Sequence, residues 1–423
     1  MKGKYYFIKK YLLLSIIVSF VFLFIPCFIL AQLVDKTPAS VPPVPGIFNR
    51  EPWEVPQITS INRDRARSTS YSYKNIEDAI SCHREVSRMM SLNGKWDFKF
   101  AATPDKAPAD FYKNRVEGWD KIDVPGDMEM QGYGRPIYKS AVYPFRPVDP
   151  PYIPYEDNSI GSYQKTFTVP ANWGAMNITL FLGGVSSCFK VWLNGKFVGY
   201  GEDSFMPSEF NITPYLIKGE NVLSVEVLRW GDGYYLEDQD QWRLSGFHRE
   251  VYIMAEPKLR IADFFYQTKL DAKYKDAIFE LRPRLDNFTG KTVDSTYVLK
   301  AQLYDEDNHP ILKKPMEKLA ISIINEIYPR LDNVKFALMQ TDIRNPKKWS
   351  DEHPYLYTLV LSLEDTASGK ILEAKSCKVG FRSVSFSKTS SKLLINGKET
   401  YLYGINRPDH DPVKGKALSA RIF

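Results

Sequence analysis

The sequence predicts a mainly β protein built from two sandwich domains in succession. Of its 423 residues, 14% are aromatic, and glycine and proline number 24 and 28, a mix that favours short strands and turns over helix bundles. Apolar residues alternate with period two in several segments that turn signals separate. A chain of this length is too long for one domain and fits two or three. We therefore expect two β cores, each built from consecutive strands.

The first series of strands covers residues 53–256. Its alternating segments are 92–100, 189–198, 223–227 and 251–254. Asn194-Gly195 lies between two of the apolar runs, and this dipeptide is the strongest short signal for a β-hairpin. Several strands with turns and no long helical period predict a jelly roll.

Pro257 marks a domain boundary, and a second series of strands covers residues 257–382. Its apolar segments are 277–283, 297–304 and 355–363. Their length and pattern suit an immunoglobulin-like β-sandwich, although the Cys…Trp…Cys spacing of antibody domains is lacking. Residues 32–52, which are rich in proline and lack periodicity, are expected to form a linker.

The first 31 residues have the features of an export signal. A basic start ends at Lys10, an apolar run covers residues 12–25, and Ala31 suits cleavage before Gln32. We therefore expect an exported protein, periplasmic or extracellular. Pro26 directly before Cys27 disfavours lipoprotein processing, so a lipid anchor is the alternative. An uncleaved anchor also stays open, because the apolar run is long enough.

Charge and cysteine usage narrow the function classes. Removing the four lysines of the signal lowers the formal charge from +6 to +2, and no basic cluster with interleaved aromatics remains, so we expect no nucleic-acid partner. Beyond the export signal we expect no membrane partner. Cys82, Cys188 and Cys377 show no paired or metal-ligand spacing. Cys188 is expected to be a buried small hydrophobe, and one disulfide stays open.

Residues 229–251 are the most informative segment for function. Within them, residues 229–243 hold two tryptophans, a Tyr-Tyr pair and four carboxylates with little aliphatic content. Aromatic faces suit the C–H faces of sugars, and carboxylates hydrogen-bond their hydroxyls. The segment therefore predicts a sugar site. The alternative is a structural loop packed under a sandwich, and for Glu237 and Asp238 we expect hydrogen bonds within the loop.

This segment closely resembles the signature of the first domain of large β-galactosidases of glycoside hydrolase family 2. Other motifs of that family occur in the same order: Leu92-Asn-Gly-Lys-Trp96, Pro136-Ile-Tyr138, Val191-Trp-Leu-Asn-Gly195, Gly201-Glu-Asp-Ser204, Trp349-Ser-Asp-Glu-His-Pro-Tyr-Leu-Tyr357 and Asn406-Arg-Pro-Asp-His410. The resemblance covers roughly residues 53–415. It implies a sugar-binding jelly roll at 53–256, the immunoglobulin-like domain at 257–382, and the start of the catalytic (β/α)8 barrel at 383–423. Such a barrel needs about 250 residues.

The resemblance also implies individual site residues. Asp240 matches the aspartate that binds sodium and galactose. Ser140 stands where the family has an asparagine contact, so its shorter side chain weakens that assignment. Pro408 replaces a substrate-binding histidine, whereas His410 keeps the second histidine of the passage. Magnesium ligands lie in the barrel, so sodium and magnesium are implied for a full-length relative and no cofactor site is expected to be complete here.

Catalysis by a retaining glycosidase needs two carboxyl groups about 5 to 5.5 Å apart. In the family both are glutamates on late barrel strands, and after Gly380 this sequence offers only Glu399, Asp409 and Asp411. Asn325-Glu326 has the same residue types as the family's acid/base pair, but we interpret it as part of an ordinary strand. We expect no other carboxyl pair to substitute.

We therefore predict the N-terminal part of a retaining β-galactosidase-type hydrolase that is inactive alone. The alternative is a non-catalytic carbohydrate-binding or scaffold protein of two β-domains. The expected partner is a β-galactoside or another glycan, with a homo-oligomer or a separate barrel polypeptide also open. Residues after Arg382 are expected to be poorly protected, and a strand near 401–405 should lack neighbours.

Overall fold

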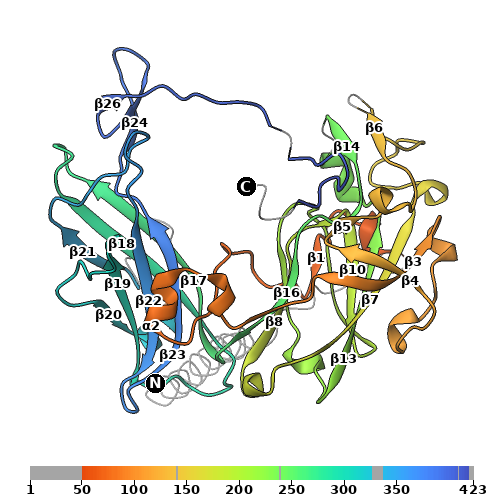
Figure 1. Cartoon of the computed structure of the whole chain (residues 1–423), viewed down its shortest axis with the longest axis horizontal. Helices are drawn as coiled ribbons and strands as arrows, with labels where there is room; N and C mark the ends of the chain where they lie inside the picture. Colours follow the sequence, from red (N-terminus) through yellow and green to blue (C-terminus); the bar gives the residue numbers. More distant parts are fainter. Residues whose placement is uncertain (1–49, 140–141, 238–239, 326–336, 408, 419–423) are drawn as a thin grey trace, which may run out of the picture. The chain divides into compact units, whose positions relative to one another are not determined.

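The computed structural model describes residues 50–139, 142–237, 240–325, 337–407 and 409–418. The expected signal peptide and most of the expected linker lie outside these residues. As predicted, the protein is mainly β (Figure 1). The α-helices among the described residues are α2 (Ile76–Ser81) and α3 (Ala320–Ile324), and neither has the length and apolar character to cross a membrane. The 3-10 helices are η1 (Pro52–Glu54), η2 (Arg84–Val86), η3 (Pro104–Lys106), η4 (Phe111–Lys113), η5 (Glu129–Gln131), η6 (Tyr155–Asp157), η7 (Ala171–Trp173), η8 (Thr213–Tyr215) and η9 (Asp232–Leu236).

The first sandwich contains two antiparallel sheets. The larger has the order β1 (Ser60–Ile61), β11 (Lys196–Gly201), β10 (Cys188–Leu193), β13 (Glu220–Leu228), β7 (Ile160–Thr168), β3 (Gly94–Ala101) and β4 (Asp120–Val124). The smaller has the order β12 (Ser208–Asn211), β8 (Asn177–Leu182), β16 (Val251–Glu256) and β2 (Met89–Ser91). Strands far apart in sequence are neighbours, as a jelly roll requires.

Alternating apolar side chains build the core between these sheets. Trp96 and Phe98 of β3 are fully buried and belong to one cluster with Leu180 of β8 and Ile253 of β16. The predicted hairpin joins β10 to β11 through Asn194-Gly195, whose φ angles of 52° and 79° lie in the left-handed region that this tight turn demands.

Two smaller sheets carry loop residues of the first sandwich. One has the order β5 (Gly126–Asp127), β15 (Gly246–Phe247) and β9 (Val185–Ser186); the other pairs β14 (Gln241–Arg243) with β6 (Ile137–Lys139). The second of these sheets joins two of the sequence motifs, at residues 137–138 and 241–243, and the first holds Asp127.

The second sandwich also has two antiparallel sheets. One sheet has the order β17 (Leu259–Leu270), β18 (Ala277–Asn287) and β21 (Met339–Ile343). The other has the order β20 (Met316–Leu319), β19 (Tyr297–Tyr304), β22 (Tyr357–Asp365) and β23 (Lys370–Val379). Phe279 of β18 shares a buried cluster with Leu299 of β19 and Leu361 of β22. Glu326 lies outside the described residues.

A buried group of charges joins the two sandwiches. Glu256, the last residue of β16, is fully buried and receives Lys375 Nζ from β23 at 2.6 Å and a guanidinium nitrogen of Arg260 from β17. Glu373 of β23 accepts the backbone N–H of Ile261 at 2.8 Å. Burial alone would raise the pKa of Glu256, but the nearby cations outweigh it and hold that pKa well below its usual range.

Cysteine behaves largely as expected. Cys188 is fully buried among apolar residues, which confirms the prediction, and burial raises the pKa of its thiol. Cys82, Cys188 and Cys377 are free thiols in the described part of the chain, so the disulfide left open by the sequence is not formed there.

The C-terminal segment corrects one expectation. Residues after Arg382 first form a small antiparallel sheet of β24 (Val384–Phe386), β25 (Leu393–Ile395) and β26 (Lys398–Glu399). Residues 401–407 are then exposed and pair with no strand among the described residues. Gly415 and Ala417, however, are buried. Residues 415–417 are therefore docked rather than unprotected, because the Lys416 N–H donates to Asp127 Oδ2 of the first sandwich.

Candidate functional site

Asp240, where the sugar site is expected, lies directly before strand β14 of a short two-stranded ribbon. In this ribbon β14 pairs with β6, so that Trp242 faces Tyr138 across the strands. The Tyr138 hydroxyl donates a hydrogen bond to Asp240 Oδ1 at 2.5 Å, and this bond raises the pKa of Tyr138. The Tyr138 and Trp242 rings are 5.5 Å apart and 53% and 43% exposed. An exposed carboxylate beside two accessible aromatic faces is the combination that sugar recognition uses.

The other aromatic residues of the informative segment are packed, as the structural alternative proposed. Trp230, Tyr234 and Tyr235 are buried in one aromatic cluster with Phe145. The Trp230 indole donates to the Asp157 carbonyl at 2.9 Å, and the Tyr235 hydroxyl donates to the Tyr152 carbonyl at 2.6 Å. These side chains therefore support the loop, and only Trp242 of its aromatics reaches the surface.

Glu237 is also structural, although its partner lies in another loop. Its carboxylate accepts the backbone N–H of Ser204 at 3.0 Å and the Ser204 hydroxyl at 2.5 Å, and burial raises its pKa. The expectation of bonds within the loop is corrected here, because the fold brings the Gly201–Ser204 loop alongside. Asp238 and Ser140 lie outside the described residues.

His410 lies in the C-terminal segment and is half-buried. In the described part of the chain no hydrogen bond or ion pair joins it to Asp240. The residue after Asp240 and the residue before His410 nevertheless line the same cavity: Gln241 and Asp409 both contribute to a cavity of about 890 Å³. The structure thus brings the two predicted positions to one region without direct contact.

Sequence reasoning missed a buried carboxyl pair. Glu202, just after β11, and Asp232, at the start of η9, are each 6% exposed. Burial raises the pKa of Glu202 to about 8 and Asp232 opposes its ionisation further, while a hydrogen bond from Tyr200 acts the other way. The raised pKa favours a protonated Glu202 carboxyl beside Asp232. The pair is too buried to meet a saccharide, so it does not replace a catalytic pair.

A second missed pair joins Asp127 of β5 to His248. Both are buried, and His248 Nδ1 lies 2.7 Å from Asp127 Oδ1. Because a carboxylate only accepts, Nδ1 carries the proton. Phe205 stacks on the imidazole at 5.5 Å, and Lys416 Nζ lies 4.7 Å from the centre of the Phe205 ring. Burial lowers the pKa of Lys416 to about 8.

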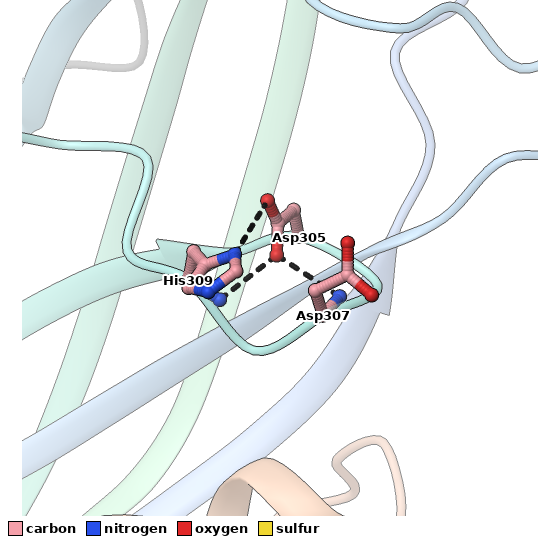
Figure 2. Close-up of side chains that lie close together, drawn as sticks. All are labelled: Asp305, Asp307 and His309. Atoms are coloured by element: carbon pink, nitrogen blue, oxygen red, sulfur yellow. Dashed lines mark hydrogen bonds and ion pairs between the residues drawn. The ribbon is translucent and has the colours of Figure 1, made fainter.

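The oxygen and nitrogen ligands of Asp305, Asp307 and His309 come within reach of one another in the second sandwich (Figure 2). Asp305 Oδ1, however, accepts the backbone N–H of Asp307 at 3.0 Å and that of His309 at 2.8 Å. These bonds close the exposed loop after β19, and the bond from His309 holds the pKa of Asp305 below its usual range. The Asp305 carboxylate thus caps its own turn.

Family models match most of the two sandwiches. Residues 89–257 match the sugar binding domain of glycosyl hydrolases family 2, and residues 259–382 match a second domain of glycosyl hydrolases family 2. The chain therefore belongs to glycoside hydrolase family 2.

Individual relatives agree with this assignment. The chain is 40% identical over 370 residues to a β-galactosidase of Priestia megaterium, covering 86% of this chain and 34% of that protein. It is 36% identical over 375 residues to a β-galactosidase of Pectobacterium atrosepticum, covering 88% and 35%. The chain thus spans about a third of the length of these curated relatives.

Solved structures share the fold. A β-glycosidase from Bacteroides vulgatus superposes with a TM-score of 0.59 at 22% identity, over 78% of this chain and 38% of that one. A Bifidobacterium dentium β-glucuronidase gives 0.59 at 19% identity, over 79% and 54%. At these identities the likeness shows the arrangement of strands alone.

Proposed function

We propose that this chain supplies the sugar-contacting part of a retaining β-galactosidase-type hydrolase and does not hydrolyse galactosides by itself. The observation that carries the proposal is Asp240, exposed beside Tyr138 and Trp242 in the segment that predicted a sugar site. The relatives described above as β-galactosidases support galactose as the sugar.

The proposed inactivity follows from the carboxylates present after Gly380. Glu399 pairs with Lys392 at 2.7 Å, and Asp409 pairs with Arg407 at 3.2 Å. Asp411 Oδ1 accepts the backbone N–H groups of Val413 and Lys414, both at 2.8 Å. Each carboxylate thus serves its own loop, whereas retaining hydrolysis needs two that face a bound sugar about 5 to 5.5 Å apart.

We expect the purified chain to bind methyl β-galactoside weakly and to leave a chromogenic β-galactoside intact. One exposed wall buries little of a ligand, so the dissociation constant should be millimolar or weaker, on the order of −4 kcal/mol. Asp240→Asn should weaken binding about tenfold by removing a charged acceptor. Ligand-observed NMR and release of the chromophore measure the two properties.

Asp203→Asn is the matched control, because Asp203 is an exposed carboxylate whose nearest cation, Arg63, is 3.7 Å away. Equal affinity of Asp240→Asn and the wild type would refute the site. Turnover that Asp240→Asn abolishes would refute the inactivity. Turnover only after a separate barrel polypeptide is added would favour the hydrolase over the scaffold alternative.

Sodium at Asp240 belongs to the same proposal. A carboxylate oxygen is the kind of ligand that sodium takes, and Oδ2 is the oxygen that Tyr138 leaves available. A single carboxylate does not make a site, so further oxygens from the sugar or from another part of the hydrolase would have to complete it. Magnesium is proposed only for the hydrolase as a whole.

Export is a further part of the proposal. The basic start, apolar run and Ala31 suit removal of the first 31 residues, so the exported protein is expected to begin at Gln32. Intact-mass spectrometry of secreted or periplasmic material measures this. A mature chain beginning at Met1 would contradict it, and a lipid adduct on Cys27 would favour the lipoprotein alternative.

A further inference from the structure

The last described segment, residues 409–418, forms a compact turn that we name the C-terminal strap. The backbones of Asp411 and Gly415 exchange hydrogen bonds of 2.8 and 2.9 Å. Asp411 Oδ1 also accepts the N–H groups of Val413 and Lys414. The strap therefore holds its own shape and can attach to the first sandwich as a unit.

One buried carboxylate attaches it. Asp127 is fully buried; its Oδ2 accepts the backbone N–H of Lys416 at 2.6 Å, while Oδ1 takes His248 Nδ1. The fit is close, because a Cβ added at Gly415 would lie 2.1 Å from Asp127 Oδ2 and 2.6 Å from Leu244. A buried anion needs its donors, so the first sandwich is stabilised when the strap supplies one of them.

The attached strap forms one side of the cavity beside Asp240. Asp409, Lys416 and Leu418 line the cavity of about 890 Å³ from the strap, whereas Gln241, His248 and Phe205 line it from the first sandwich. Cavities that bind small ligands fall between about 300 and 1,000 Å³. With the strap detached, the same surface would be an open face.

We propose that Asp127 is a positioning residue that holds the strap and thereby completes a saccharide cavity next to Asp240. Galactose contacts Asp240, and the sugar linked to it extends into the cavity between Gln241 and the strap. This inference rests on the proposed function, because it concerns the same saccharide.

Limited trypsin digestion of the full chain tests the attachment. The bonds after Lys414 and Lys416 each join a lysine to a buried residue, whereas the bond after Lys398 joins two exposed residues and serves as the internal reference. Asp127→Ala removes both acceptors and should speed cleavage in the strap about tenfold or more relative to the reference, because cleavage follows the open population. Asp123→Ala, at an exposed carboxylate, should leave the ratio unchanged.

A variant on the strap itself tests whether faster cleavage comes from a detached strap or from a misfolded first sandwich. Gly415→Ala leaves Asp127 and His248 intact but places a methyl group against the carboxylate, so it should open the strap to the same degree. Gly290→Ala is its control: φ is +69° there and +65° at Gly415, but a Cβ at position 290 meets no atom within 4 Å. Unchanged strap cleavage in both Asp127→Ala and Gly415→Ala would overturn the proposal.

Asp127→Asn provides the conservative rescue. Its side-chain oxygen can still accept from the Lys416 N–H while its amide donates to His248 Nδ1, which requires the other imidazole tautomer. We expect a closed strap and a changed His248 tautomer in ¹⁵N NMR spectra. A strap as open as that of Asp127→Ala would show that this hydrogen bond is not the attachment, and would overturn the proposal.

Lactose separates the positioning role from simple structural support. Because coupling between two events is reciprocal, lactose well above its dissociation constant should slow strap cleavage in the wild type, and Asp127→Ala should bind lactose more weakly. Lactose binding without protection would overturn the proposal. If the wild type binds neither lactose nor methyl β-galactoside, the proposed function fails and the positioning role with it; cleavage ratios without sugar still report the attachment separately.

Discussion

Glu256→Gln is expected to destabilise the protein by about 3 to 5 kcal/mol, the usual consequence of removing one partner from a buried ion pair. Glutamine keeps the shape but not the charge, so Lys375 would lose its 2.6 Å partner and keep only Glu373 at 3.7 Å, and Arg260 would keep only Asp286 and Asp64. Urea denaturation of the full chain, followed by tryptophan fluorescence, measures the loss at neutral pH.

Glu317→Gln is the control for this prediction. Glu317 lies 3.8 Å from Lys300 at the surface, where an ion pair contributes about 1 kcal/mol or less. Similar small losses in both variants would contradict a stabilising role for the buried charges. Because the pKa of folded Glu256 lies below its unfolded value, its contribution is present at neutral pH and disappears on acidification below the ordinary carboxyl range.

The difference in stability between the Glu202→Gln variant and the wild type is expected to reverse its sign with pH. The folded pKa of Glu202 is raised to about 8 by burial and by Asp232, so the folded state retains a proton that the unfolded state releases near pH 4.3. The contribution of Glu202 to wild-type stability should therefore fall as the pH rises from about 4.5 to 8 and then level off. The glutamine amide can donate to Asp232 at every pH, so the variant should be more stable at pH 9 by a few kcal/mol.

Urea midpoints at pH 5 and pH 9 test this sign. Glu220→Gln is the matched control, because Glu220 is exposed and pairs only at the surface with Arg115, at 3.2 Å. Its pH dependence should follow that of the wild type. A Glu202→Gln variant that loses stability with pH as steeply as the wild type would show that Glu202 does not hold this proton.

Local sequence was sufficient for the hairpins and for the kind of fold. Asn194-Gly195, the predicted hairpin, takes positive φ between antiparallel strands, as does Asn396-Gly397, which was not singled out from the sequence; this dipeptide accepts the left-handed conformation that a tight turn needs. Period-two alternation predicted β3 and β18 because a strand with one buried face must alternate. The informative segment likewise pointed to Asp240 through its residue types alone.

Contacts between distant segments could not be predicted from the sequence. The Tyr138–Asp240 bond and the Glu202–Asp232 pair join residues on separate motifs, and pairing of strands across loops brings them together. The expectation that the whole C-terminal segment is unprotected was wrong for residues 415–417, because nothing local reveals that Asp127 accepts the Lys416 N–H.

The sequence by itself determined the mainly β architecture, the family resemblance and the residue types offered to a sugar, because alternation, turn chemistry and motifs are local properties. Only the tertiary structure decided which aromatics support the loop and which face solvent, where the charges of Glu256 and Asp127 are compensated, and that the strap lines one cavity with Gln241, the residue after Asp240. The physical reason is burial. The free energy that a charge or an aromatic ring contributes depends on what surrounds it, and those surroundings come from strands and loops far away in the chain.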